Sequence, residues 1–324
     1  MTHFLNEPQL ALSFYDNHAG KPRSFAKPLL KWAGGKTQLL SQIEQKLPSD
    51  LETGQLTRYA EPFVGGGAVL FHLVRHYNIS EIFISDQNPN LILAYRVVQQ
   101  DAEQLIAELT KIQTEYYQLD EIQQKKFFYQ VRRTFNQHQS HSISTQLGYD
   151  EIVQTARLFF LNRTCFNGLY RVNRAGKFNV PFGGYKNPKI CDPENILAVS
   201  LVLQMAQIVH GDFVQSLSFA DKYTFAYCDP PYRPLTKTAS FNNYAKQGFD
   251  DRDQTRLASF ACQLNQRGAK FMISNSDPHN EDPEDNFFVD LYQDFQIHKV
   301  SAKRMINSKS AGRGEISELL ITNY

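Results

Sequence analysis

The chain has 324 residues, enough for about two domains. Charged residues make up 21% of it and hydrophobic residues 42%, a composition that excludes a disordered or fibrous protein. The 34 basic and 33 acidic side chains give a net charge of +1, so total charge gives no sign of a nucleic-acid partner. No apolar run predicts a transmembrane helix, and the first 16 residues do not resemble a signal peptide.

Cysteine and histidine spacing gives no indication of a metal site or a disulfide framework. The four cysteines are scattered without a CxxC pair, which is typical of a reduced cytoplasmic protein. His72 and His76 lie four positions apart, but neither has a cysteine or an HExxH-type partner. We therefore expect no bound metal.

The N-terminal part of the chain changes from irregular to regular. Residues 1–24 lack periodicity and are expected to form a loose arm. Apolar residues at helical spacing then predict a helix over residues 36–47. A short strand near residues 58–60 leads into three glycines at 65–67.

A second strand is expected soon after these glycines. Residues 68–77 form a helical pattern, and residues 81–85 are a buried strand that ends at Asp86. The order strand, glycine turn, helix, strand and acid predicts a βαβ nucleotide-binding unit.

Long helical patterns rich in Gln and Tyr fill much of the segment from residue 89 to 206. We predict helices over residues 90–109, 110–117, 122–139 and 151–160. A turn-rich stretch follows, with a hairpin near 162–187. The segment 89–206 is therefore expected to be a mostly helical insert.

Alternation of strands and helices returns after residue 206. Strands are predicted over 225–228, 270–273, 297–300 and 316–322, and helices over 254–268 and 287–292. The expected fold is α/β, with one doubly wound, Rossmann-like sheet built from residues 25–88 and 207–324 and interrupted by the helical insert.

Two glycine motifs differ from the usual phosphate-binding patterns. The tripeptide at 35–37 is not a P-loop, because Leu30 stands where that motif needs a glycine. The glycines at 65–67 do not complete GxGxxG, because Leu70 takes the last position. Asp86 follows about 20 residues later, where a carboxylate can bind the hydroxyls of a ribose. We therefore expect a nucleoside ligand that lacks a pyrophosphate. S-adenosylmethionine is a nucleoside of this kind.

The most specific motif is Asp229-Pro230-Pro231-Tyr232, which follows the strand at 225–228. Two prolines remove two N–H donors and stiffen the turn. The Asp229 carboxylate and the Pro230 carbonyl are thus fixed acceptors for the two N–H groups of an exocyclic amine. Tyr232 offers an aromatic face on which a base can stack.

The motifs together resemble one family. The segments are Lys31-Trp32-Ala33-Gly34-Gly35-Lys36, Glu61-Pro62-Phe63-Val64-Gly65-Gly66-Gly67, Asp86, Phe166-Asn167-Gly168-Leu169-Tyr170-Arg171 and the DPPY motif at 229–232. In this order they resemble the Dam/DpnM group of DNA adenine-N6 methyltransferases. Further matches extend the likeness from about residue 28 to 324. The resemblance implies a methyl transfer from S-adenosylmethionine to N6 of an adenine flipped out of duplex DNA, without a metal.

The resemblance also implies roles for individual residues. Cofactor contacts are implied for Trp32, Lys36, Phe63, Gly65, Gly67, Asp86 and Asp229. Catalytic roles are implied for Asp229, Pro230 and Tyr232. DNA contacts are implied for Phe166, Asn167, Leu169, Arg171 and Pro181. Asp212 is expected near the cofactor adenine.

The target sequence and the biological setting are less constrained. GATC is the favoured target, although relatives that read GATC often carry an arginine where this chain has Gly184. A different target sequence that contains AT is the alternative. A restriction–modification role beside a cognate endonuclease is favoured over a solitary Dam-type role. We expect a cytoplasmic, bacterial monomer. N4-cytosine or glutamine methylation and a non-catalytic DNA-binding protein are the alternatives, and Asp229 in the first position of its motif favours adenine.

The distribution of charge supports a DNA partner better than the total does. Basic residues without any acid occupy residues 17–43, 153–191 and 300–314, with five, seven and four of them, respectively. The rest of the chain carries 18 basic and 33 acidic side chains. This layout predicts a basic DNA face and salt-dependent binding.

Overall fold

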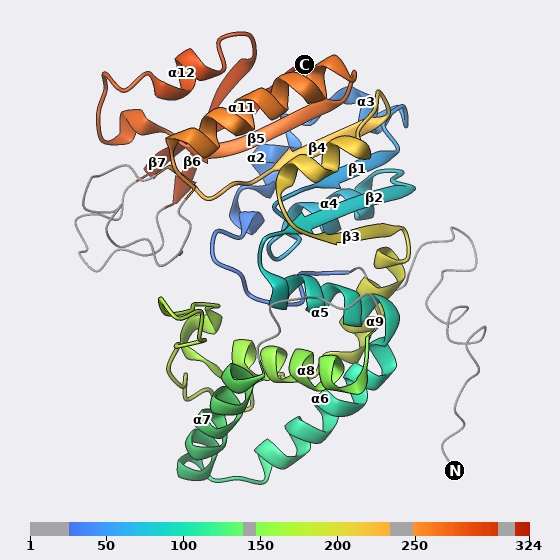
Figure 1. The fold of residues 1–324 in the computed structure, drawn as a ribbon, viewed down its shortest axis with the longest axis vertical. Helices are drawn as coiled ribbons and strands as arrows, with labels where there is room; N and C mark the ends of the chain where they lie inside the picture. The colour runs from blue at the N-terminus through green and yellow to red at the C-terminus, as the bar shows by residue number, and fades with distance from the viewer. Residues whose placement is uncertain (1–25, 139–146, 234–248, 304–314) are drawn as a thin grey trace.

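The computed structural model describes residues 26–138, 147–233, 249–303 and 315–324. The expected N-terminal arm and most of the basic stretch at 300–314 lie outside these residues. The described chain forms a seven-stranded sheet in the order β3-β2-β1-β4-β5-β7-β6 (Figure 1). Its strands are β1 (Arg58–Glu61), β2 (Glu81–Asp86), β3 (Ala206–His210), β4 (Thr224–Cys228), β5 (Lys270–Ser276), β6 (Gln296–Lys303) and β7 (Glu315–Thr322).

The strand directions confirm the expected Rossmann-like fold. Strands β3, β2, β1, β4 and β5 pair in parallel, whereas β7 lies between β5 and β6 and is antiparallel to both. The chain goes from β1 to β2 on one side and returns to β4 on the other, so the order reverses at β1.

Side chains alternate between two hydrophobic cores, one on each face of the sheet. Tyr59 and Tyr227 belong to the core that includes α4 (Ala68–His76) and α5 (Pro89–Gln100). Their neighbours Ala60 and Cys228 belong to the core formed with α11 (Asp251–Gln266) and α12 (Phe287–Leu291). Burial on both faces explains why these strands read as continuous apolar runs.

Five α-helices are formed by the described residues between β2 and β3. After α5 come α6 (Ala102–Tyr117), α7 (Glu121–Gln137), α8 (Tyr149–Thr164) and α9 (Pro193–Leu203). Helices α5 and α9 contact β3, while α6, α7 and α8 lie farther from the sheet (Figure 1).

Two predicted helix boundaries are wrong. The break expected at 109/110 is absent, because Leu105, Leu109 and Tyr116 are buried along one continuous face of α6. The real break falls at Asp101, whose φ of −136° and ψ of 40° leave the helical region.

The single helix expected over residues 36–47 is also wrong. It is divided into a short 3₁₀ helix, η1 (Lys36–Gln38), and α2 (Leu40–Glu44), with α3 (Ser49–Glu52) beyond. The division places Lys36 at the start of η1, where its side chain is buried.

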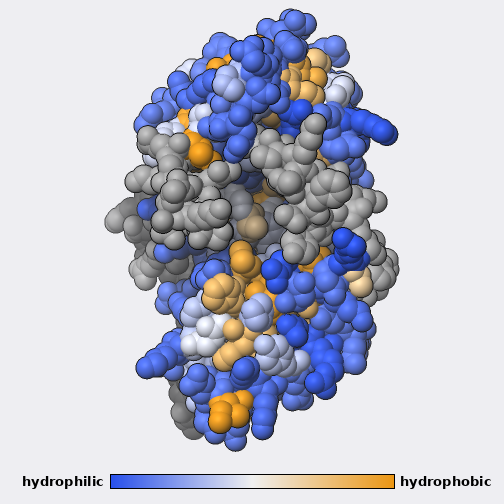
Figure 2. Space-filling view, turned by 90° about the vertical axis from the view of Figure 1, so that its left-hand side faces the viewer, coloured by the Kyte–Doolittle hydropathy of each residue, from blue (hydrophilic) through white to orange (hydrophobic). Residues whose placement is uncertain are grey.

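The segment predicted as a hairpin near 162–187 contains little regular structure. It has two isolated antiparallel bridges, Cys165 with Phe182 and Val172 with Phe178, and a 3₁₀ turn, η2 (Phe166–Gly168). Figure 2 shows a hollow on the side of the molecule that carries this segment, with apolar side chains gathered directly below it.

Within the described residues, no helix is both long enough and apolar enough to cross a membrane.

Candidate active site

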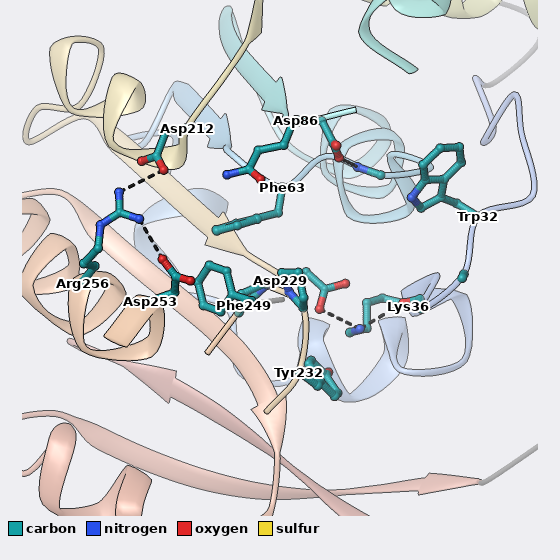
Figure 3. A pocket seen from close by; sticks show the side chains of 16 residues that line it. Trp32, Lys36, Phe63, Asp86, Asp212, Asp229, Tyr232, Phe249, Asp253 and Arg256 are labelled. Atoms are coloured by element: carbon teal, nitrogen blue, oxygen red, sulfur yellow. Dashed lines mark hydrogen bonds and ion pairs between the residues drawn. The ribbon is translucent and has the colours of Figure 1, made fainter. Parts of the chain in front are cut away.

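A cavity of about 810 Å³ lies at the carboxyl ends of β1, β2 and β4 (Figure 3). This volume is typical of small-molecule sites, and ligands of such sheets bind where the strand order reverses. Six of the seven residues predicted for the cofactor line the cavity: Trp32, Lys36, Phe63, Gly65, Asp86 and Asp229. Gly67 lines a smaller adjoining cavity of about 30 Å³.

The glycine turn after β1 forms one wall by exposing backbone. Gly65 has φ +47°, and a Cβ on it would lie 3.1 Å from Cδ1 of Trp32. Gly67 has φ +71° and is the N-cap of α4, and a Cβ there would lie 2.8 Å from the hydroxyl of Tyr95. That hydroxyl donates to the Gly65 carbonyl at 3.0 Å. Only glycine fits both positions without displacing a neighbour.

Asp86 is held at the end of β2 by backbone donors. Its Oδ2 accepts from the Gly65 N–H at 3.2 Å, and its Oδ1 accepts from the Asn88 N–H at 2.8 Å. Burial raises the pKa of Asp86, and these two hydrogen bonds oppose the rise. Each oxygen keeps a second lone pair, so the carboxylate can accept two ligand hydroxyls.

Lys36 and Asp229 form an ion pair beneath the cavity. The ammonium nitrogen is 2.7 Å from Oδ1 of Asp229 and also donates to the Gly34 carbonyl at 3.0 Å. The hydroxyl of Ser274 on β5 donates to the same Oδ1 at 2.9 Å. Among the described residues, both side-chain contacts use Oδ1, so Oδ2 remains available as an acceptor.

Burial dominates the protonation of Asp229 and raises the pKa of its carboxyl group. The Lys36 ammonium and the Ser274 hydroxyl favour the carboxylate and oppose this rise. Asp229 is thus a desolvated hydrogen-bond acceptor, and Lys36 and Ser274 stabilise its negative charge.

Two contacts fix the ring of Tyr232. Its hydroxyl donates to Oε2 of Glu318 on β7 at 2.6 Å, and Lys36 Nζ lies 4.6 Å from the ring centroid. Burial raises the pKa of Glu318, and the bond from Tyr232 opposes this. Pro230 is buried, whereas Pro231 is exposed. The contacts with Glu318 and Lys36 therefore hold the ring in one orientation.

The opposite wall of the cavity is aromatic. Phe63 stacks on Phe213 with ring centroids 5.4 Å apart and meets the edge of Phe249 at 5.8 Å. Asp212, expected near an adenine, lines the same wall and pairs with Arg256 at 2.9 Å.

Several residues of the site escaped prediction from the sequence. Glu61 is buried, accepts a bond from Tyr59 at 2.8 Å and lines the smaller cavity beside Asp229. Burial raises its pKa well above the ordinary value. Its place just before the glycine turn was a usable signal. Ser274 and Glu318 lie in segments that extend the family resemblance, but no role was predicted for either, because only the strand order brings them to Asp229 and Tyr232.

The residues predicted to contact DNA lie together on residues 165–187, here called the turn segment, and none of them lines the cavity. Phe166 is 53% exposed, and Asn167 beside it is exposed with φ +58°. The Phe166 N–H donates to the Pro181 carbonyl at 2.9 Å, which joins the two ends of the segment. Arg171 is exposed and donates to the Asn179 side chain at 2.8 Å, while Leu169 is half-buried.

Within the described parts of the chain, one group of possible metal ligands lies outside the cavity. Glu44, His72 and His76 offer ligand atoms within 4.8 Å of one another. The sequence showed the two histidines but not Glu44, which α2 brings beside them. His72 faces Glu44 at 3.5 Å, and His76 bonds the His72 carbonyl at 2.8 Å, so the three side chains already engage one another or the backbone.

Known proteins match this chain along almost its whole length. A family model described as D12 class N6 adenine-specific DNA methyltransferase matches residues 32–306. Type II methyltransferase M.MjaIII of Methanocaldococcus jannaschii is 51% identical over 299 residues, which cover 92% of this chain and 99% of that protein. Type II methyltransferase M1.LlaDCHI of Lactococcus lactis is 38% identical, with 92% and 95% covered. DNA adenine methylase of Escherichia coli is 32% identical, with 91% and 94% covered.

These matches span the glycine turn, the DPPY motif and the segment between them. The family model covers most of the chain, and the relatives are matched over nearly all of their own length. The chain belongs to the D12 class of N6 adenine-specific DNA methyltransferases.

Proposed function

We propose that this enzyme methylates N6 of adenine in the duplex sequence GATC, on a base flipped into the cavity beside Asp229. The observation that carries the proposal is the position of Asp229. Lys36 and Ser274 hold its Oδ1, while Oδ2 is available at the edge of the cavity. The neighbouring Pro230 carbonyl is the second acceptor for an amine.

The cavity fits S-adenosylmethionine better than a phosphorylated nucleotide. Asp86 can accept both ribose hydroxyls, and the same carboxylate would repel a phosphate. Trp32 and Phe63 give aromatic and apolar walls, and the glycine turn removes the side chains that would obstruct a ligand. When bound, S-adenosylmethionine supplies the activated methyl group.

Asp229 and Pro230 prepare the nucleophile. The lone pair of the adenine amine is delocalised into the ring, which makes N6 a poor nucleophile. Hydrogen bonds from its two N–H groups to Asp229 Oδ2 and the Pro230 carbonyl favour a localised lone pair. The carboxylate also stabilises the positive charge that develops on N6, so the chain contributes orientation and electrostatics.

Tyr232 gives the flipped base a surface on which to stack. Its hydroxyl bond to Glu318 and its contact with Lys36 hold the ring in one orientation. An amine inside a duplex cannot reach Asp229, so the base must leave the stack.

The turn segment at 165–187 supplies the DNA contacts in this proposal. Phe166 and Asn167 are exposed at its tip, where they can fill the space left by the flipped base. Leu169, Arg171 and Pro181 would contact the recognised bases. The segment 89–206 would then be the target-recognition insert of the catalytic domain at 25–88 and 207–324.

The names of the relatives favour a restriction–modification role. M.MjaIII and M1.LlaDCHI are type II methyltransferases, and they match this chain more closely than the Escherichia coli DNA adenine methylase does. We therefore propose that the enzyme protects cytoplasmic DNA from an endonuclease that it need not contact, and that it acts as a monomer. A solitary role is the alternative, since DNA adenine methylases are also among the relatives.

The test is to express the chain in a host that lacks adenine methylation and to sequence single DNA molecules. We expect N6-methyladenine in GATC sites, and none when Asp229→Ala replaces the wild type. Methylation confined to another sequence would refute the proposed target. An active Asp229→Ala variant would refute the proposed site.

A further inference from the structure

Helix α8 holds the segment that carries Trp32. The side chain of Asn162 accepts from the Lys31 N–H at 2.9 Å and donates to the Lys31 carbonyl at 2.9 Å. Next to it, Arg163 donates to the Leu29 carbonyl at 2.8 Å. Asn162 is only 1% exposed, so this paired clamp is shielded from water.

The same asparagine also holds the tip of the turn segment. Its amide nitrogen donates to the Gly168 carbonyl at 3.0 Å. A Cβ on Gly168 would lie 2.3 Å from Cδ of Lys31, so the Lys31 side chain packs directly against the backbone of Gly168. The cavity wall and the turn segment are therefore fixed to one residue.

A stacked ring pair makes the second connection. Trp32 and Tyr170 have ring centroids 4.8 Å apart and an interplanar angle of 18°. Trp32 also lies against Gly65 of the glycine turn. Tyr170 accepts from the Asn90 side chain at 3.2 Å through its hydroxyl. Asn90 is in the first turn of α5, directly after Asp86 and the Asn88 cap.

Tyr170 thus contacts Trp32, which lines the cofactor cavity, and Asn90, which follows Asp86 in the chain. It also stands between two residues that face DNA in the proposed function. Leu169 precedes it and Arg171 follows it. A change in the position of Trp32 must be accommodated by the ring of Tyr170, and a change in the turn segment must be accommodated by Trp32.

We propose that Tyr170 is a positioning residue that couples occupancy of the cofactor cavity to recognition of DNA by the turn segment. The inference rests on the proposed function of both regions. Because coupling between two binding sites is reciprocal, cofactor and cognate duplex should each raise the affinity for the other by the same factor. We expect a factor of about ten.

The chain provides its own probe, since Trp32 is its only tryptophan. Cognate duplex, added without cofactor, should change the emission of Trp32 through the stacked tyrosine. A duplex of unrelated sequence should change it less. Tyr170→Leu should abolish the response, whereas Tyr170→Phe keeps the stacked ring and should retain most of it.

The thermodynamic test measures the affinity of S-adenosylhomocysteine by calorimetry, with and without saturating cognate duplex. Tyr170→Leu should reduce the coupling factor from about ten to nearly one, while each separate affinity changes by less than about threefold. Tyr185→Leu is the control, because Tyr185 bonds the Asn167 N–H at 2.8 Å on the same segment. It should weaken duplex binding and leave the coupling factor unchanged.

The outcomes separate this inference from the proposed function. A Tyr170→Leu variant that folds and keeps the wild-type coupling factor would overturn the inference, as would a wild type with no coupling that still methylates GATC. A wild type that binds neither ligand would instead refute the proposed function. Melting temperatures of all variants establish that they are folded.

Discussion

The ammonium group of Lys36 lies 2.7 Å from Oδ1 of Asp229, and the two side chains are only 7% and 19% exposed. An enclosed ion pair of this kind adds little stability by itself, because both charges lose their hydration. Loss of one partner is costly, since the other charge is then left buried and unpaired.

This pair predicts different effects on stability and on activity. We expect Lys36→Met to lower the free energy of unfolding by about 3 kcal/mol, because Asp229 loses its counter-ion. The double variant Lys36→Met/Asp229→Asn should recover most of that loss. Neither it nor Asp229→Asn alone should regain methylation, which should stay at least about 100-fold below wild type. Urea unfolding and duplex methylation assays measure the two effects. Equal recovery of stability and methylation in the double variant would contradict the proposed role.

Ser274 should tune the pH dependence of methyl transfer. Its hydroxyl stabilises the Asp229 carboxylate, so Ser274→Ala should raise the pKa of Asp229 further. An acid is protonated below its pKa, and the acidic limb of the rate profile should therefore move to higher pH. Single-turnover rates from pH 5 to 9 measure the shift.

A matched control for this variant is Ser216→Ala. Ser216 is equally buried, but its hydroxyl donates to the Phe213 carbonyl at 2.7 Å rather than to Asp229. The acidic limb of the pH–rate profile of Ser216→Ala should coincide with that of the wild type. If both variants shift alike, a general structural effect explains the result.

The glycine turn predicts a steric effect that can be separated from backbone strain. Gly67 and Gly54 have nearly equal φ, +71° and +72°, but a Cβ meets Tyr95 and Phe71 within 3 Å at Gly67 and nothing within 4 Å at Gly54. Alanine at either position pays the left-handed backbone cost of about 1 kcal/mol. Gly67→Ala should cost about 1–3 kcal/mol more and weaken S-adenosylhomocysteine binding. Equal losses in thermal unfolding would show that the contact with Tyr95 is unimportant.

Asp277 should contribute stability that is lost in acid. Burial alone would raise its pKa, but bonds from Ser317, His279 and Lys299 hold the pKa at about 2. Because the pKa of Asp277 is lower in the folded protein, its ionised carboxylate contributes stability at pH values above the unfolded pKa of 3.8. This stability is lost as the pH falls toward about 2. At pH 7, Asp277→Asn should be less stable by about 2 kcal/mol. Urea unfolding between pH 7 and pH 3 should show that the difference in free energy of unfolding between wild type and Asp277→Asn becomes smaller below pH 4. A constant difference would contradict the stabilising role of the Asp277 carboxylate.

Gly184 tests how the target sequence is set. It has φ +66°, and nothing lies within 4 Å of a Cβ placed there. Gly184→Arg should therefore fold, with a backbone cost of about 1 kcal/mol. We expect tighter, more salt-dependent duplex binding and unchanged GATC methylation. Gly54→Arg, equally open and distant from the turn segment, is the control. A changed methylation motif on sequencing would show that this position selects the bases.

The sequence predicted those parts of the site that depend on local order. Asp86 ends one apolar strand and Asp229 follows another, so their place at the carboxyl edge of a sheet could be inferred from the sequence pattern. The glycine turn was predicted for the same reason. The family resemblance added Trp32 and Lys36. The predicted helix over residues 36–47 gave the wrong surroundings for Lys36, which begins η1.

Long-range contacts could not be predicted in this way. The stack of Trp32 on Tyr170 and the clamp by Asn162 join segments more than 130 residues apart. The sequence predicts that Asn162 begins a turn-rich stretch, but it belongs to the last turn of α8, where its side chain reaches the Lys31 backbone. No periodicity encodes such a contact, because it depends on how the helices pack against the sheet.

The position of β7 has a consequence for folding of the enzyme during its synthesis on the ribosome. This strand follows every other described strand in the chain, yet it lies between β5 and β6 and carries Glu318, the partner of Tyr232. Until β7 has emerged from the exit tunnel, β5 and β6 lack the strand that joins them and Tyr232 lacks its anchor. A nascent chain therefore cannot hold the Tyr232 ring by this hydrogen bond before β7 has left the exit tunnel.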